Sequence, residues 1–325
     1  MRRFKRFERF KKLPFSLVLS AVFFASCATA PRLTAPTADD VPQLFSLLPA
    51  GGSLYLWADV EAGRPLLDAL SIGGFTAGDA AMVIDRTDEA AVVFFGGHEE
   101  RRFFIAAMGR YPRHRANYAF AFSRAWQRQR SSYGGTFWVA RNGEMAVSFA
   151  RRLALVSNID PLAPMEIVTM PEAFAQFREG SAIAGWITSP SDQINSILGS
   201  MGVPLQIPAE DLFFAAIRSP ATWTAGDSDV EVHEALWELA FRIRTPSPFH
   251  AGLLTMLFTQ ARNLVLHAAG QAAQAPTHML SFQDVALMLF SNVPEQDGEF
   301  ITIRIDSLSE NDISLLFALF SVYSN

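Results

Sequence analysis

Three segments of this sequence recur later in the chain, in the same order and at a nearly constant offset. "GSLYLWADV" from Gly52 has a counterpart in "GSAIAGWIT" from Gly180, an offset of 128 residues. "GRYPRHRANYAFAF" from Gly109 aligns with "IRTPSPFHAGLLTMLF" from Ile243, an offset of 134. "VSFARRLALVSNIDP" aligns with "LSFQDVALMLFSNVPE" when one residue is inserted. Because self-similarity at a fixed period indicates duplication, we expect two tandem domains, each too long to be a solenoid repeat.

Each predicted domain mixes strand and helix patterns. Apolar residues alternate with small or polar ones over residues 145–149 and 301–306, the period of half-buried strands. Asn142 and Gly143 lie between two such runs and predict a tight type I′ hairpin turn. The spacing of apolar residues predicts helices over residues 112–130 and 248–266, the first with Tyr118, Phe122, Ala125 and Trp126 on one face. This combination predicts an α+β fold: two tandem copies of an antiparallel-sheet domain with helices packed on the sheet.

One more helix is expected at the C-terminal end. Ser309 and Asp312 resemble the capping box that begins a helix, and residues 313–323 are apolar nearly all round. Such a helix is usually interior, and otherwise it would line a lipid groove or dock on a membrane.

The first 26 residues have the order of a secretory signal. Residues 1–12 contain four Arg and three Lys against one Glu, and the run of residues 13–26 carries no charge. That run is shorter than the ~20 residues a membrane-spanning helix needs. Ala25 and Ser26 are small, and Cys27, the only cysteine of the chain, follows at once.

This arrangement resembles the lipobox of bacterial lipoproteins, in the looser form known from spirochaetes, with Phe24 in place of the usual Leu. The resemblance covers residues 1–27 only. It implies that the Cys27 thiol receives a diacylglycerol, that residues 1–26 are removed, and that the protein lies in the bacterial envelope, facing the periplasm or the cell surface. No thiol then remains for disulfides or cysteine catalysis.

Two alternatives remain for this segment. A cut after Ala30 satisfies the small-x-small rule but places Pro31 after the scissile bond, and an uncleaved signal would act as an anchor. Under the lipoprotein interpretation, residues 27–46, rich in Pro and polar residues, form a flexible tether. Residues 47–170 and 171–325 then form the two repeat domains.

The charge of the mature chain excludes several functions. Of 27 basic and 32 acidic residues, seven and one lie in residues 1–26, which leaves 20 basic residues, all Arg, against 31 acidic ones. Without a lysine after Lys12, the mature chain has no phosphate-loop or Schiff-base lysine. The acidic total argues against nucleic-acid binding.

Arginine is nevertheless concentrated in residues 98–152, which hold 11 Arg against three Glu. These residues are either ordinary solvated side chains or a patch that contacts anionic headgroups or an acidic partner. The candidate contact residues are Arg101, Arg102, Arg113, Arg115, Arg124 and Arg128.

Catalytic and metal-binding signals are weak. No nucleophile-elbow, dinucleotide-binding or phosphate-loop motif occurs, and no H-E-x-x-H, so we expect no cofactor and no metal. His98, Glu99 and Glu100 fit a solvated hairpin tip better than a metal site. His233 is flanked by Glu231 and Glu234 and is the least poor candidate for an acid or base. Without a nucleophile or a second catalytic group to place beside it, it fits a surface-strand histidine better.

Two hypotheses follow. The first is a non-enzymatic, lipid-anchored envelope protein whose two copies bind or scaffold a protein partner or an apolar ligand. The second is an envelope hydrolase with a site assembled around His233.

Overall fold

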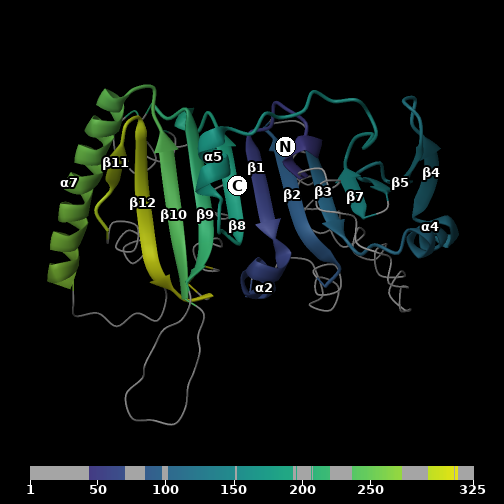
Figure 1. Ribbon diagram of the computed structural model, residues 1–325, viewed down its shortest axis with the longest axis horizontal. Helices are drawn as coiled ribbons and strands as arrows, with labels where there is room; N and C mark the ends of the chain where they lie inside the picture. Colours follow the sequence, from purple (N-terminus) through teal and green to yellow (C-terminus); the bar gives the residue numbers. More distant parts are fainter. Residues whose placement is uncertain are drawn as a thin grey trace, which may run out of the picture. The chain divides into compact units, whose positions relative to one another are not determined.

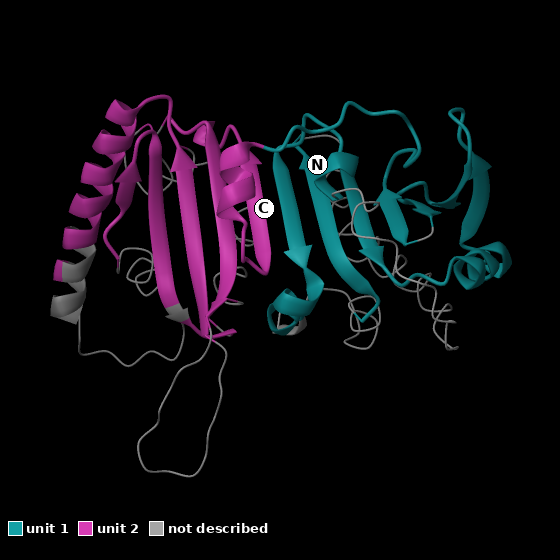
Figure 2. Cartoon of the chain, viewed as in Figure 1, with its two compact units in different colours: residues 1–170 teal, residues 171–325 magenta. Residues whose placement is uncertain are grey.

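The computed structural model describes residues 44–69, 85–96, 102–150, 152–192, 195, 206, 208–219, 236–272, 292–310 and 312–313. The chain divides into two compact units, unit 1 over residues 1–170 and unit 2 over residues 171–325 (Figure 2). Each unit combines an antiparallel sheet with a few helices, so the predicted α+β character is confirmed. The predicted signal, Cys27 and the first part of the tether lie outside the described residues.

Unit 1 is built on one antiparallel sheet with the strand order β1-β2-β3-β7-β6-β5-β4 (Figure 1). In chain order its elements are η4 (Leu44–Leu47), β1 (Leu54–Asp59), α2 (Val60–Ala69), β2 (Thr87–Phe95), β3 (Arg102–Gly109), α4 (Arg113–Phe122), β4 (Trp126–Arg130), β5 (Thr136–Ala140), β6 (Ala146–Phe149) and β7 (Leu153–Ser157). The strand β4 therefore occupies one end of this order, with β5 as its neighbour.

Unit 2 has an antiparallel sheet with the strand order β8-β9-β10-β12-β11. Its elements are α5 (Glu172–Phe177), β8 (Ile183–Thr188), β9 (Asp211–Ser219), β10 (Leu236–Arg244), α7 (Pro248–Ala272), β11 (Glu295–Asp297) and β12 (Phe300–Leu308). The helix α7 lies beside β11 and β12 (Figure 1). Ala251 and Leu254 of α7 pack with Ile243 and Ile301 of the sheet, which confirms the helix predicted after Pro248.

Of the two alternating patterns, only the one over residues 301–306 corresponds to a strand with one buried face. Residues 145–149 include β6, but Met145, Ala146, Val147 and Ser148 are all buried, so both faces of that strand are covered. Ile301, Ile303 and Ile305 of β12 are all buried, whereas Arg304 between them is exposed. Burying every second side chain against the core satisfies the two-residue period of a strand. The strand prediction over residues 301–306 is therefore confirmed.

The predicted hairpin at Asn142 and Gly143 exists, but its turn differs from the one expected. The backbone N–H of Gly143 donates to the Ala140 carbonyl at 2.8 Å, and Gly143 has a φ of 75°. Asn142 does not have the positive φ that a type I′ turn requires at both central positions. The last backbone hydrogen bond of the hairpin runs from the Ala140 N–H to the Met145 carbonyl and encloses four residues. The loop is therefore longer than the two-residue loop of a type I′ turn, and of Asn142 and Gly143 only Gly143 has a left-handed backbone.

The helix predicted over residues 112–130 is wrong in its second half. Helix α4 ends at Phe122 because Ser123 has an extended backbone, with φ −78° and ψ 126°. Trp126 begins β4, opposite Ala140 of β5. The expected apolar face is also wrong, since Tyr118 and Phe122 are 67% and 82% exposed.

The predicted capping box at Ser309 is confirmed. The Asp312 N–H donates to Ser309 Oγ at 3.2 Å, and the Ser309 N–H donates to Asp312 Oδ2 at 2.9 Å. Ile313 is fully buried, and the rest of the predicted apolar helix lies outside the described residues. None of the helices within the described ranges is both long and apolar enough to cross a membrane.

Candidate binding surface

The end of unit 1 formed by α4, β4, their flanking loops and the turn after β5 carries a dense positive charge, and we call it the arginine edge. Between residues 110 and 141 the sequence has seven Arg and no Asp or Glu. All seven are exposed: Arg110, Arg113, Arg115, Arg124, Arg128, Arg130 and Arg141.

Several other arginines of the described structure have acidic partners. Arg152 pairs with Asp88 at 2.8 Å, and Arg304 pairs with Glu238 at 2.7 Å. Across the described part of the chain, no carboxylate lies within ion-pair distance of any arginine of the arginine edge. Arg128 instead donates to the Thr136 hydroxyl at 3.2 Å. The charge of this surface is therefore available to an external anionic group.

A tight connection between β3 and α4 fixes the start of this surface. Gly109 lies so close to Arg86 that an added Cβ would fall 2.0 Å from the Arg86 carbonyl oxygen, which only glycine tolerates. The buried Tyr111 hydroxyl lies 2.8 Å from the Thr87 hydroxyl. Burial, the largest cause, raises the pKa of Tyr111 to about 12, so this side chain stays a neutral hydrogen-bonding group.

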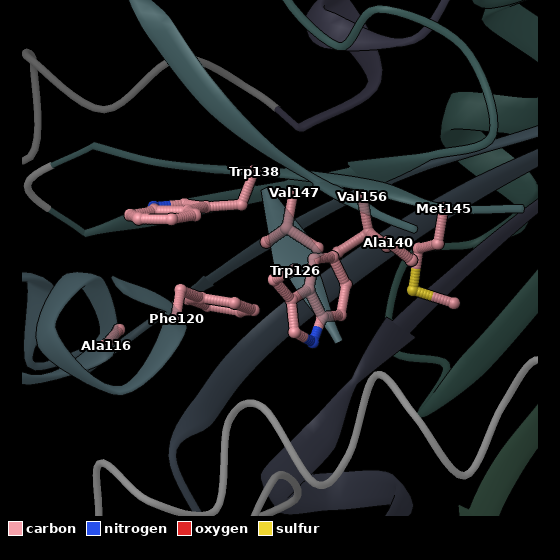
Figure 3. Packing of buried hydrophobic residues seen from close by; sticks show 8 residues of the cluster. All are labelled: Ala116, Phe120, Trp126, Trp138, Ala140, Met145, Val147 and Val156. Atoms are coloured by element: carbon pink, nitrogen blue, oxygen red, sulfur yellow. The ribbon is translucent and has the colours of Figure 1, made fainter. Parts of the chain in front are cut away.

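Beneath the arginine edge, an aromatic cluster attaches α4 to the sheet (Figure 3). The Phe120 ring contacts Trp126 edge to face, with centroids 4.7 Å apart, and stacks on Trp138 at 5.6 Å. Trp138 Nε1 donates to Asn117 Oδ1 at 2.8 Å, a second link between β5 and α4. This packing holds the exposed arginines of α4 and β4 on a rigid base.

The outer side of α4 adds aromatic surface to the positive charge. Tyr118 and Phe122 stack on each other with ring centroids 6.2 Å apart and an interplanar angle of 13°. Tyr133, in the loop after β4, is 64% exposed. Exposed aromatic groups next to arginine suit a surface that contacts a partner, because both residue types are enriched at interfaces.

The structure brings four of the six predicted contact residues together. Arg113 and Arg115 lie in α4, Arg124 lies in the following loop, and Arg128 lies in β4. Arg102 is placed elsewhere, at the end of β3 away from α4, with its guanidinium 5.7 Å from the centroid of the Phe95 ring. Arg101 lies outside the described residues.

The sequence-based list omitted several residues of this surface. The sequence contains a signal for three of them, because residues 110–141 hold no Asp or Glu: Arg110, Arg130 and Arg141. Tyr118 and Phe122 could not be predicted to lie on this surface, because a helical pattern that continued to Trp126 assigned them to the core.

The residues considered for catalysis and metal binding contribute no site to the described structure. His233 and the group His98, Glu99 and Glu100 lie outside the described residues, so the hydrolase hypothesis stays a prediction. Among the residues whose placement is described, no three His, Cys, Asp or Glu gather as metal ligands. His250 lies at the start of α7, with Nδ1 2.8 Å from Ser247 Oγ.

Comparison with known proteins identifies structural likeness without sequence relatives. No family model matches the chain, and no curated protein does. Crystal form IV of TP0453 matches with a TM-score of 0.54 and 14% identity, covering 86% of this chain and 98% of that one. Crystal form III of TP0453 matches with a TM-score of 0.52 and 16% identity, covering 86% and 99%. The chain shares its fold with TP0453. At this level of identity the likeness concerns the fold alone.

Proposed function

We propose that this chain is a lipid-anchored envelope protein whose mature part is a non-enzymatic binding module. The arginine edge carries the proposal: seven exposed arginines, without acidic partners in the described structure, flank exposed aromatic side chains. Such a surface attracts anionic groups electrostatically. The lipobox-like segment at Cys27 supports attachment to a membrane through an N-terminal lipid, which would keep the binding surface at the envelope.

We also propose that the two units derive from a duplication, as the sequence repeats suggest. The strand order β1-β2-β3-β7 of unit 1 corresponds to β8-β9-β10-β12 of unit 2, with α4 and α7 following the third strand in each. Trp57 Nε1 bonds Glu89, and Trp186 Nε1 donates to Asp211 at 2.7 Å. In both cases the carboxylate lies two residues before the cross-strand partner of the tryptophan, which supports a common origin.

The anchor is tested by a Cys27→Ala substitution in the full chain. If Cys27 carries the lipid, the substitution removes the only acceptor thiol, so incorporation of radiolabelled palmitate falls to background. The variant should also leave the membrane fraction or keep its signal peptide, seen as a shift in mass. Labelling equal to that of the unchanged protein would contradict the proposal.

The binding role is tested by reversing charge on the arginine edge. We expect the chain to bind immobilised polyglutamate or vesicles containing phosphatidylglycerol at low ionic strength. Because each basic residue near an anionic surface contributes about 1 kcal/mol, the double variant Arg124→Glu, Arg128→Glu should bind at least about tenfold more weakly. Arg218 is exposed in β9 of unit 2, so Arg218→Glu is the matched control and should bind as before. Binding of neither probe by the unchanged chain would contradict the binding role.

A further inference from the structure

We propose that β4 accepts an acidic, extended segment of a protein partner, which adds as a strand to the open edge of unit 1. The inference rests on the proposed binding role and specifies what the arginine edge binds. It requires three properties of β4: free backbone groups, an edge that is not covered, and a charge pattern that selects the incoming strand.

The backbone groups of Arg128 and Arg130 point away from β5. The Arg141 N–H donates to the Ala125 carbonyl at 2.9 Å, and the Ser131 N–H donates to the Gly135 carbonyl at 3.3 Å. In an antiparallel pair the residues that bond across the ladder alternate, so residues 125, 127, 129 and 131 face β5. Arg128 and Arg130 therefore present two N–H donors and two carbonyl acceptors on the outer side.

Within the ranges that the structure describes, nothing covers this edge. β4 pairs with β5 alone, residues 127–130 are all exposed, and no backbone bond is made by Arg128 or Arg130 on the outer side. The end strand of unit 2 is different. β11 has three residues, and Gln296 Nε2 donates to the Pro248 carbonyl at the start of α7 at 3.0 Å, so that a helix lies beside this strand. Short strands and covering helices are usual protections of sheet edges. β4 has five residues, and the adjacent α4 packs on its buried face through Phe120 and Trp126 while residues 127–130 stay exposed.

The side chains of β4 select an acidic strand. Arg128 and Arg130 lie on the same face as Trp126, about 6.8 Å apart along the strand. An added antiparallel strand would place its residues j and j+2 directly opposite these two arginines, where opposite charges are favourable. Because the arginines have no acidic partner in the described structure, an uncharged or basic strand would leave them uncompensated.

The backbone pattern also favours a polypeptide over a membrane surface. The outer edge of β4 offers donors and acceptors in alternation, and an extended chain satisfies both. A phospholipid phosphate accepts hydrogen bonds without donating any, so it would leave the Arg128 and Arg130 carbonyls unpaired. The lipid alternative is therefore an outcome of the test.

The test uses the acylated mature chain in detergent and a peptide in which glutamate alternates with valine over seven residues. Binding is measured by fluorescence anisotropy for the unchanged chain and for Arg128→Ala and Arg128→Pro. Both substitutions remove the same charge. Both also remove the side-chain bond from Arg128 to Thr136. Proline removes the outward N–H in addition, and no β4–β5 backbone bond is lost because the Arg128 N–H faces away from β5. We expect Arg128→Pro to bind about tenfold more weakly than Arg128→Ala, since one hydrogen bond is lost and the ring obstructs the incoming strand. Equal affinity of the two variants would overturn the inference.

A second measurement does not depend on the folding of any variant. A peptide with the same sequence but N-methylated at every glutamate keeps its charge. The residues that would lie opposite Arg128 and Arg130 then have no backbone N–H to donate, and the edge that can still pair places valine opposite the arginines. We expect the unchanged chain to bind the methylated peptide at least about tenfold more weakly. If both peptides bind equally, recognition is by charge alone, which overturns strand addition and leaves the binding role standing. Binding to phosphatidylglycerol vesicles but not to the peptide would have the same consequence. Binding to neither would overturn both proposals.

Discussion

Replacing Phe120 by alanine is expected to destabilise unit 1 by about 3–5 kcal/mol, the usual cost of removing a large buried aromatic side chain. Phe120 is 1% exposed and contacts both Trp126 and Trp138. Its ring joins α4 to β4 and β5, so its loss leaves a cavity at the base of the arginine edge. The measurement is hydrogen exchange of the backbone amides of β4 and β5, because local opening energies can be followed in one unit of a two-unit chain.

The matched control for this prediction is on the same helix. Phe122→Ala removes the same side chain from a position that is 82% exposed, and it should change stability by no more than about 0.5 kcal/mol. If the two substitutions increase exchange in β4 and β5 equally, Phe120 does not have the packing role described above. A larger effect of Phe122→Ala would indicate that the stacked Tyr118 and Phe122 rings are buried by a partner.

Replacing Asp211 of unit 2 by alanine is expected to cause the second large loss of stability. Asp211 is 5% exposed, its Oδ1 accepts from Trp186 Nε1 at 2.7 Å, and its Oδ2 lies 2.5 Å from Arg244 Nη2, an ion pair without hydrogen-bond geometry. Asp211→Ala removes both contacts, with the carboxylate that accepts from the Trp186 indole N–H. Breaking a fully buried ion pair costs about 3–5 kcal/mol, and because the Arg244 side chain is 38% exposed we expect about 2–3 kcal/mol.

The residue before Asp211 in the sequence, Glu210, provides the control for this prediction. Glu210 also pairs with Arg244, at 3.4 Å, but its side chain is 47% exposed. Since exposed ion pairs contribute about 0–1 kcal/mol, Glu210→Ala should have a small effect. Hydrogen exchange of β9 and β10 separates the two outcomes, and a loss of protection as large in Glu210→Ala as in Asp211→Ala would contradict this explanation.

Several elements could be predicted because their signals are local. The alternation of Ile301, Ile303 and Ile305 corresponds directly to one buried face of β12. The Ser309 and Asp312 capping box requires only residues within one helical turn. The hairpin near Gly143 was also predictable, but its turn type was not, because loop length depends on which residues of β5 and β6 pair.

The helix predicted over residues 112–130 shows where local patterns are insufficient. Trp126 fits the apolar face of a continued helix, and it equally fits the buried side of a strand. The structure selects the strand because β5 supplies backbone partners and Phe120 and Trp138 supply packing, and these contacts come from outside the local window. Because the chain forms a strand here and not a continued helix, Tyr118 and Phe122 face outward. The arginines after Ser123 then lie on a sheet edge.

The sequence by itself determined the mixed α+β character, the positions of the strongly patterned elements and the excess of arginine after residue 98, since these depend on composition and short-range periodicity. Only the tertiary structure decided which arginines lie together. Arg102 lies away from Arg113 because β3 extends away from α4. Arg128 lies on the same surface as Arg113 because β4 returns beside α4. The amino acids of a segment set its charge, whereas strand pairing and side-chain packing set where that charge lies in the folded protein.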